Sequence, residues 1–386
     1  MNVIQIVPSV VVESSGPSYS VPALCKGLAS VGCDVSLRFL DDIPPQLVHA
    51  PYEALTYPRR EVFIRNLGRS PDMLAALRDA ARTADILHSN GLWMMPNVYP
   101  AWVTRRLRQR KENPRLKLVT SPRGALAKWS LAKGKWKKRI FGVLLQYPAL
   151  RLTDMFHATS EKEYEEIRAR GYRQPVAIIP IGMDVPEVES CVKEDAGRVR
   201  KVLFFGRLHK VKGVERLVYA WGEVAKDGWE LVIAGPDCGM LEELKRIVAE
   251  RKLPRVSFVG EINGHAKYEF LAGGDIYVLP SDTENFGVTV TESLASGTPV
   301  IASQGTPWQG LEREKCGRWI PIGVEPLAVA LKEIMAMSDE ERAAMGARGR
   351  EWIRREFSWK GIGVQMKVAY EWLLGNAICP SCVRKD

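Results

Sequence analysis

The stretch SDTENFGVTVTESLASGTPVIAS, residues 281–303, predicts a loop, a helix and a buried strand in direct succession. A second apolar strand, IYVLP at 276–280, precedes the loop, and Gly297 ends the helix. Strand, helix and strand in this order form one unit of a parallel sheet, and ligands of such sheets bind beyond the carboxyl ends of the strands. The loop therefore occupies the position where a ligand is expected.

The alternation of short apolar strands and helices runs through both halves of the chain. It is interrupted near 183–199, where proline and acidic residues accumulate and the periodicity is lost. The expected fold class is therefore α/β, with two domains in tandem. The predicted divisions are an N-terminal domain at 1–184, a linker at 185–199, a C-terminal domain at 200–358, and a terminal helix with a tail at 359–386.

Composition places the chain among ordinary globular proteins. It has 386 residues, of which 46% are hydrophobic and 26% charged, enough for two cores. No run of eighteen apolar residues occurs and no basic region opens the chain, so a cytosolic protein is expected. The seven cysteines are scattered. Cys379 and Cys382 form one CxxC without a second pair or nearby histidines, which favours two thiols over a zinc or redox site.

The net charge of +10 is concentrated in one region. Residues 105–139 hold fourteen Lys or Arg against a single acid, Glu112. Within this region, the segment around KWSLAKGKWKKRIF alternates basic with aromatic and aliphatic residues, as a helix on an anionic membrane surface does. A solvated basic face and a nucleic-acid contact are the alternatives. The candidate membrane contacts are Lys128, Trp129, Lys135, Trp136, Lys137, Lys138 and Arg139.

A second loop also carries anion-binding residues. LFFGRLHKVKG, residues 203–213, ends a strand at Gly206 and places Arg207 and Lys212 before a helix. A glycine allows close approach of the backbone to an anion, and cations at a helix start would hold it. The loop matches neither a Walker A motif nor GxGxxG.

The stretch at 281–303 holds two glutamates on either side of a helix start. Glu284 lies in the loop, Glu292 lies about one turn inside the helix, and backbone amides of Phe286, Gly287 and Val288 lie between them. Amides at a helix start can bind phosphate, whereas carboxylates accept hydrogen bonds from sugar hydroxyls. A nucleotide-diphosphate sugar has this layout, with a ribose and a hexose on either side of two phosphates. An N-terminal carboxylate with a solvated glutamate is the plainer interpretation of the stretch by itself.

Taken together, GRLHKVKG, ENFGVTVTE and SGTPVIAS resemble the retaining GT-B glycosyltransferases of family 4, also known as glycosyl transferases group 1. The resemblance is strong over about 200–305. It is looser in the first half, where SSGPSYSVPALCKGLASVGCDV is similar to the family's glycine-rich acceptor-side loop. It implies two Rossmann-like domains facing each other across a cleft, with a C-terminal helix that crosses back to the N-terminal domain. Trp359, Met366, Tyr370 and Trp372 are plausible anchors of that helix.

The resemblance also implies roles for individual residues. Arg207, Lys212 and Glu284 would be catalytic, the two cations on the donor diphosphate and Glu284 near the reacting carbon of the sugar. The implied donor site comprises these three with Gly16, Gly206, Asn285, Phe286, Gly287, Val288 and Glu292, which would bind the ribose. His88 and Asn90 would lie toward the transferred sugar, and Arg123 toward an acidic acceptor or a phosphate.

The implied reaction transfers a hexose with retention from a UDP- or GDP-linked donor. The cations would stabilise the departing diphosphate, with no metal, no cofactor and no named general base. The expected acceptor is lipid-linked or a saccharide of the kind found in surface polysaccharides or lipopolysaccharide, with the protein peripheral to the cytoplasmic face of the inner membrane. A soluble acceptor, a dinucleotide-dependent oxidoreductase and a nucleic-acid binder are the rivals. An oxidoreductase would need a GxGxxG motif, which this sequence does not have, and nucleic-acid binding would leave the residues of the two loops unexplained.

Overall fold

The computed structural model describes residues 1–11, 16–40, 42–60, 67–127, 130–131, 135–186 and 197–385. The chain forms two compact units. The N-terminal unit combines Met1–Gly182 with Trp359–Asp386, and the C-terminal unit is Met183–Ser358. Most of the predicted linker, 185–199, lies outside the described residues.

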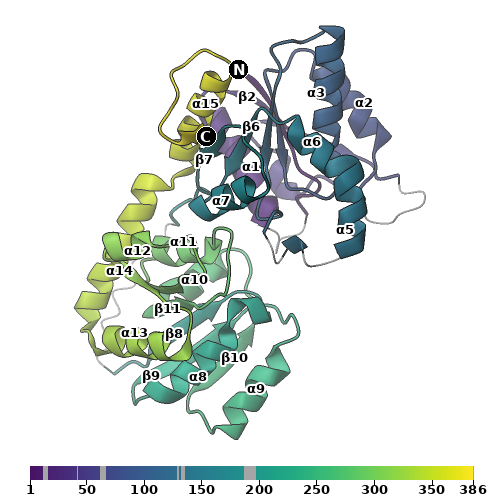
Figure 1. The fold of residues 1–386 in the computed structure, drawn as a ribbon. Helices are drawn as coiled ribbons and strands as arrows, with labels where there is room; N and C mark the ends of the chain where they lie inside the picture. Colours follow the sequence, from purple (N-terminus) through teal and green to yellow (C-terminus); the bar gives the residue numbers. More distant parts are fainter. Residues whose placement is uncertain are drawn as a thin grey trace. The chain divides into compact units, whose positions relative to one another are not determined.

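The N-terminal unit is built on one sheet in the order β14-β7-β6-β5-β4-β1-β2-β3 (Figure 1). All neighbours in it are parallel except β14, which runs antiparallel to β7. Its strands are β1 (Asn2–Ile6), β2 (Asp34–Leu40), β3 (Glu53–Tyr57), β4 (Ile86–Asn90), β5 (Lys117–Ser121), β6 (Met155–Ala158), β7 (Val176–Ile178) and β14 (Val383–Arg384). Every residue of β4 and β6 is buried, as expected for parallel strands covered on both faces.

The helices of this unit lie between its successive strands, except α15, which follows the C-terminal unit. They are α1 (Gly16–Ser30), η1 (Pro45–Leu47), α2 (Pro71–Ala80), η2 (Met95–Asn97), α3 (Tyr99–Arg110), α5 (Lys135–Phe141), the π-helical turn η3 (Gly142–Gln146), α6 (Tyr147–Arg151), α7 (Glu161–Ala169) and α15 (Trp359–Leu373). Ser70 and Ser160 begin α2 and α7 as N-caps, each accepting a hydrogen bond from the third helical amide.

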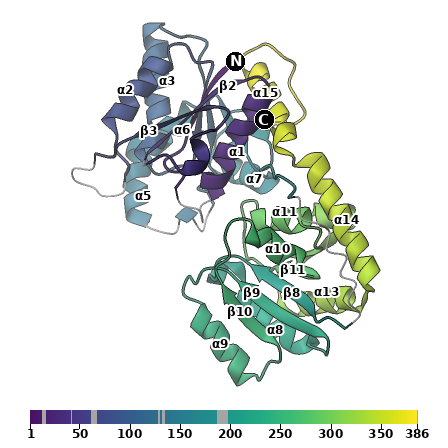
Figure 2. The same cartoon turned by 180° about the vertical axis from the view of Figure 1, so that it is seen from behind.

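The C-terminal unit has a parallel sheet in the order β10-β9-β8-β11-β12-β13 (Figure 2). Its strands are β8 (Arg200–Phe205), β9 (Trp229–Ala234), β10 (Val256–Gly260), β11 (Ile276–Leu279), β12 (Val300–Ser303) and β13 (Gly317–Ile320). Its helices are η4 (Lys210–Lys212), α8 (Val214–Val224), α9 (Leu241–Glu250), α10 (Ala266–Ala272), α11 (Val288–Ala295), α12 (Gly310–Arg313), α13 (Val324–Ala336) and α14 (Asp339–Glu356). The predicted helix within 281–303 is thus confirmed, with Gly297 in a left-handed conformation after it.

The C-terminal helix α15 crosses back to the N-terminal unit, as predicted. It packs against α1 in both views (Figures 1 and 2). A Cβ atom on Gly27 would lie 2.4 Å from the carbonyl oxygen of Trp359, and one on Gly363 would lie 2.4 Å from that of Gly27. Two glycines therefore allow the helix backbones to touch. Of the predicted anchors, Trp359, Met366 and Tyr370 are buried and Trp372 is half-buried.

The tail after α15 adds a strand that sequence analysis did not predict. Val383 and Arg384 form β14 beside β7, and Arg384 also pairs with Glu161 at 2.7 Å. Cys379 and Cys382 are unpaired thiols just before this strand. Two residues are too few to give a detectable alternation of side chains.

A chain of buried hydrogen bonds ties α15 to the sheet. The His157 Nε2 atom lies 2.9 Å from the carbonyl oxygen of Ile179, so this nitrogen must carry the proton. Its Nδ1 atom then accepts from the Ser121 hydroxyl at 2.7 Å, and Ser121 accepts from His88 Nε2 at 2.7 Å. His88 Nδ1 accepts in turn from the Tyr370 hydroxyl at 2.6 Å. One carbonyl thereby sets the tautomers of both neutral histidines.

Replacing Gly363 with alanine should destabilise the N-terminal unit by about 1–3 kcal/mol, because the new methyl group would overlap the backbone of α1. Thermal unfolding of the purified protein measures this loss. Val364→Ala, at an exposed position of the same helix, is the control and should change the melting temperature little. A Gly363→Ala protein as stable as the wild type would contradict the close helix crossing.

Acid should destabilise the fold through the buried histidines. Burial, together with the charge of Arg123, lowers the pKa of His157 to about 3, and burial likewise lowers the pKa of His88. At a pH below the ordinary pKa of 6.5 but above the lowered pKa of the folded protein, a histidine is protonated in the unfolded chain and neutral in the folded one. The free energy of unfolding therefore falls as the pH falls, by at most about 1.4 kcal/mol per pH unit for each histidine.

Unfolding in denaturant between pH 7 and pH 4 measures this dependence. His157→Asn should flatten the decline, while His49→Gln, at an exposed position, should not. Equal slopes for wild type and His157→Asn would show that the buried histidine does not contribute.

Candidate functional site

The loop after β8 presents an exposed cation. Gly206 ends the strand with φ +154°, and its carbonyl oxygen would lie 2.0 Å from a Cβ atom on Gly235, so two strand ends touch there. Arg207 follows and is exposed. Within the described part of the chain its guanidinium group forms no ion pair and no hydrogen bond. Arg207 is therefore available to an anion.

The second predicted cation, Lys212, is already paired. Its Nζ atom lies 2.6 Å from Oε1 of Glu284, and both side chains are largely buried, at 14% and 13% exposed. The Ser281 hydroxyl donates to the same carboxylate oxygen at 2.7 Å. The structure thus brings together Lys212 and Glu284, which lie 72 residues apart in the sequence.

The helix start predicted to bind phosphate is present at α11. Gly287 caps the helix with φ +81°, a conformation that favours glycine. The side chain of Phe286 is buried against Trp308, whose indole nitrogen donates to the carbonyl oxygen of Phe286 at 2.6 Å. The Phe286 ring therefore anchors the loop, and Val288 begins the helix behind it. Asn285 lies half-buried in the same loop.

The two loops are joined by hydrogen bonds. The amide of Asp282 donates to the carbonyl oxygen of Val211 at 2.8 Å. Below this contact, the buried Tyr277 hydroxyl lies 3.1 Å from the carbonyl oxygen of Phe205, at the end of β8, and 2.6 Å from the hydroxyl of Thr289 in α11. The loop with Arg207 and the start of α11 are thereby held in one arrangement.

The second glutamate also has a lysine partner. Glu292 projects from α11 and is 5% exposed, and Lys267 of α10 lies 2.5 Å from its Oε1 atom. Burial raises the pKa of Glu292, and the charge of Lys267 offsets part of this effect. Lys267 and Tyr277 were not singled out from the sequence. Neither belongs to a loop motif, and only the folded sheet brings them to this site.

The arrangement combines four elements within the C-terminal unit: an exposed arginine, two lysine–glutamate pairs, and a helix N-terminus. Arg207, the Lys212–Glu284 pair and the start of α11 belong to the loops that follow β8 and β11, which are neighbours in the sheet, and the Lys267–Glu292 pair joins α10 to α11. Cations and helix amides stabilise negative charge, and the carboxylates can accept from hydroxyls. Such a site can hold a diphosphate with a hydroxyl-bearing group at each end.

The two residues predicted to lie toward the transferred sugar, His88 and Asn90, are in the N-terminal unit and are buried in a strand. Strand β4 continues through Asn90, so the side chains of His88 and Asn90 lie on one face, where both are fully buried. Asn90 donates to Gln5 Oε1 at 2.8 Å and accepts from Arg123 at 2.9 Å. Both side chains belong to the buried hydrogen-bond chain, and their place toward the transferred sugar stays a prediction.

Arg123 lies at the outer end of this chain. It has φ +55°, burial lowers its pKa, and its Nε atom is buried without a hydrogen-bond partner. Glu163 fixes the next residue by accepting from the amide of Gly124 at 2.7 Å. Gly16, the remaining predicted residue of this unit, opens α1, and no atom lies within 4 Å of a Cβ built on it.

The predicted membrane contacts are described in part. Lys128 and Trp129, with the side chains of Lys135 and Lys137, lie outside the described residues. Trp136 and Arg139 are exposed on α5, whereas Lys138 turns inward, donates to the carbonyl oxygen of Ser130 at 2.6 Å and lies over the ring of Trp93. None of the helices in the described ranges is long and apolar enough to cross a membrane.

No group of three His, Cys, Asp or Glu side chains placed to hold a metal ion occurs within the residues that the structure describes. The anion-binding elements found here are side-chain cations and backbone amides. Metal independence of the reaction stays a prediction.

Two family models match the chain one after the other. The model of the glycosyl transferase 4-like domain matches residues 15–182, and that of glycosyl transferases group 1 matches residues 192–352. Together they cover most of both units.

Among curated proteins, the chain is 30% identical over 214 residues to the GDP-mannose-dependent monoacylated alpha-(1-6)-phosphatidylinositol monomannoside mannosyltransferase of Corynebacterium glutamicum. The match covers 49% of this chain and 54% of that protein, so the chain spans about half the length of this curated relative.

Two solved structures share the fold along almost the whole chain. Sucrose-phosphate synthase from Thermosynechococcus elongatus superposes with a TM-score of 0.72 at 22% identity, covering 98% of this chain and 100% of that one. The Anabaena protein HepE in complex with UDP and glucose gives a TM-score of 0.72 at 17% identity, with 95% and 98% covered. On the two matched models and this shared fold, the chain belongs to the glycosyl transferases of group 1, in family 4 of the GT-B glycosyltransferases.

Proposed function

We propose that this protein is a retaining, metal-independent hexosyltransferase that uses a nucleotide-diphosphate sugar and acts on a lipid-linked or saccharide acceptor. The observation that carries the proposal is the set of charges at the carboxyl ends of β8 and β11. There, Arg207, which has no ion pair within the described ranges, follows β8 in the loop that also holds Lys212, and Lys212 is paired with Glu284 before the start of α11.

These residues suit the loss of a diphosphate. When the bond between the sugar and the phosphate breaks, negative charge grows on the departing group. Arg207, Lys212 and the first amides of α11 would stabilise this charge, and of these Lys212 and the amides are held by contacts within the fold. Lys212 would exchange part of its contact with Glu284 for the diphosphate, which leaves the Glu284 carboxylate to accept from sugar hydroxyls. In a retaining transfer the departing phosphate would receive the proton of the acceptor.

Glu292 is the proposed contact of the ribose. Its carboxylate is held by Lys267 and buried, so little freedom would be lost on binding a ribose hydroxyl. The named substrate of the corynebacterial relative, GDP-mannose, makes GDP-mannose a candidate donor for this chain. The UDP complex of HepE supports UDP-linked donors as the other candidate.

A lipid-linked acceptor is supported by an exposed apolar stripe. Four side chains at helical spacing on α5 and η3 are half to two-thirds exposed: Trp136 (67%), Ile140 (53%), Val143 (59%) and Leu144 (67%). With Arg139 beside them they resemble a helix face that lies in an anionic membrane surface. The corynebacterial relative is named for a phosphatidylinositol acceptor, which is consistent with work at a membrane. A soluble acceptor is the alternative that this stripe disfavours.

Removing either cation should slow the transfer strongly. Arg207→Ala and Lys212→Ala are each expected to lower kcat by about 10²–10³, corresponding to about 2.7–4 kcal/mol of transition-state stabilisation. Initial rates with the donor identified by binding, measured with EDTA present, test this. Lys210→Ala, at an exposed lysine of the same loop, is the control and should keep its rate. Near-normal turnover in a folded Arg207→Ala protein would exclude the assigned role.

Nucleoside diphosphates should stabilise the protein against heat. At a hundred times its dissociation constant a ligand adds about 2.7 kcal/mol, which is readily seen as a rise in melting temperature. UDP, GDP and their common sugar conjugates should be compared with NAD(H), without metal and with EDTA. Glu292→Gln should weaken the response, whereas Glu269→Gln, at an exposed position of α10, should not. Stabilisation by NAD(H) alone would refute the proposed donor site.

A further inference from the structure

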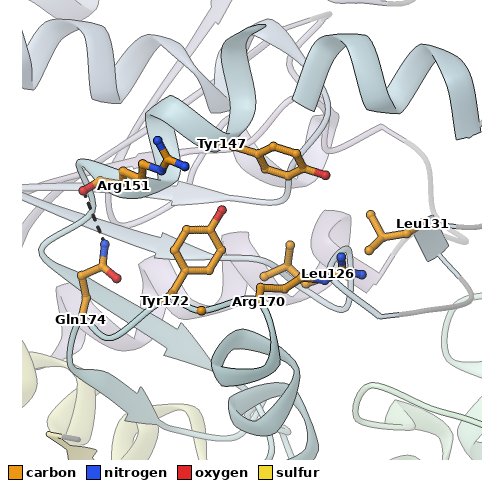
Figure 3. Close-up of a pocket in the computed structure, with 8 residues that line it drawn as sticks. Leu126, Leu131, Tyr147, Arg151, Arg170, Tyr172 and Gln174 are labelled. Carbon is orange, nitrogen blue, oxygen red and sulfur yellow. Dashed lines mark hydrogen bonds between the residues drawn. The ribbon is translucent and has the colours of Figure 1, made fainter. Parts of the chain in front are cut away.

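A pocket in the N-terminal unit lies outside every residue assigned so far. It has a volume of about 510 Å³ and lies between α6, the turn after α7 and the segment that follows β5 (Figure 3). Its lining combines two arginines, two tyrosines and two leucines: Arg151, Arg170, Tyr147, Tyr172, Leu126 and Leu131.

The two arginines of the pocket lining, Arg151 and Arg170, are exposed at the ends of two helices. Arg151 ends α6 and Arg170 follows α7, and neither guanidinium group has a carboxylate within ion-pairing distance among the described residues. Two arginines at one cavity without an acid favour an anion, and the planar guanidinium suits the oxygens of a phosphate.

The tyrosines supply neutral hydroxyl groups to the same space. Figure 3 shows Tyr147 and Tyr172 facing the space between Arg151 and Leu131. Burial raises the pKa of Tyr172 to about 12, so its hydroxyl keeps its proton and can donate. Tyr147 is fixed by edge-on packing against Trp93, with ring centroids 6.1 Å apart, and by the close approach of Gly142 to its ring.

The apolar side of the pocket connects to the exposed stripe. Tyr147 directly follows the π-helical turn η3, which carries Val143 and Leu144. Leu131 adjoins Ser130, whose carbonyl oxygen is bound by Lys138 of α5. A ligand with an anionic head and an apolar body would therefore find two exposed arginines in the pocket lining and exposed apolar side chains on the neighbouring helix segment.

We infer that this pocket binds the phosphate head group of an anionic membrane lipid, with the phosphate between Arg151 and Arg170. The inference rests on the membrane-facing acceptor proposed above and makes it more specific. A free nucleotide or sugar phosphate would use the cations but would leave the leucines and the neighbouring stripe without a partner.

Binding of soluble short-chain lipids tests the inference. The full chain should bind dihexanoyl phosphatidic acid at one site in titration calorimetry, and more tightly than dihexanoyl phosphatidylcholine or inorganic phosphate. Arg151→Gln and Arg170→Gln should each weaken this binding about tenfold or more, because each removes a charge-assisted contact. Arg173→Gln, at an exposed arginine outside the pocket, is the matched control and should bind as the wild type does.

Vesicle binding then tests whether the bound phosphate belongs to a lipid in a membrane. Co-sedimentation with phosphatidylglycerol vesicles should fall by about tenfold in the Arg151→Gln, Arg170→Gln double variant and persist in Arg173→Gln. Equal losses in the control, equal binding of inorganic phosphate, or unchanged vesicle binding by the double variant would each overturn the inference.

The nucleotide melting shifts of these variants serve as an independent readout. They should match the wild type, because the pocket and the donor-type site belong to different units. If nucleotides do not stabilise even the wild type, the proposed glycosyl transfer is refuted, whereas the lipid-binding measurements still test the pocket.

Discussion

The parallel pairing of β8 with β11 is the constraint on which the candidate donor site depends. Parallel neighbours end at the same edge of a sheet, so the loops after the two strands meet although about 70 residues separate them. The bond from Asp282 to Val211 and the buried hydroxyl of Tyr277 then fix the loops to each other. The Lys212–Glu284 pair can form only because this framework is already in place.

The same logic explains how far the sequence could predict the site. Residues 281–303 predicted a loop, a helix and a strand because glycines and apolar runs are local signals, and the structure has Glu284 in the loop, Gly287 at the helix start and Glu292 in the helix. Lys267 could not be found in this way. It comes from an ordinary amphipathic helix, and its relation to Glu292 is a property of packing between α10 and α11.

The N-terminal unit shows the opposite case. Strand β4 continues through residues 88–90, and the period of two in a strand directs His88 and Asn90 to one buried face. What lies over that face is Tyr370, 282 residues further along the chain, and no local pattern could reveal it. The crossing of α15 was implied by the family resemblance, but the glycine contact that lets it approach α1 was not.

The discontinuous make-up of the N-terminal unit has a consequence for its biosynthesis. Its first strands are translated early, yet Tyr370, Gly363 and β14 are translated only after the whole of the C-terminal unit. The C-terminal unit, which is continuous, can close while the first sheet still exposes the face that α15 will cover. The nascent chain therefore completes its second unit before its first, and for that interval the uncovered surface of α1 is the part that a chaperone would need to shield.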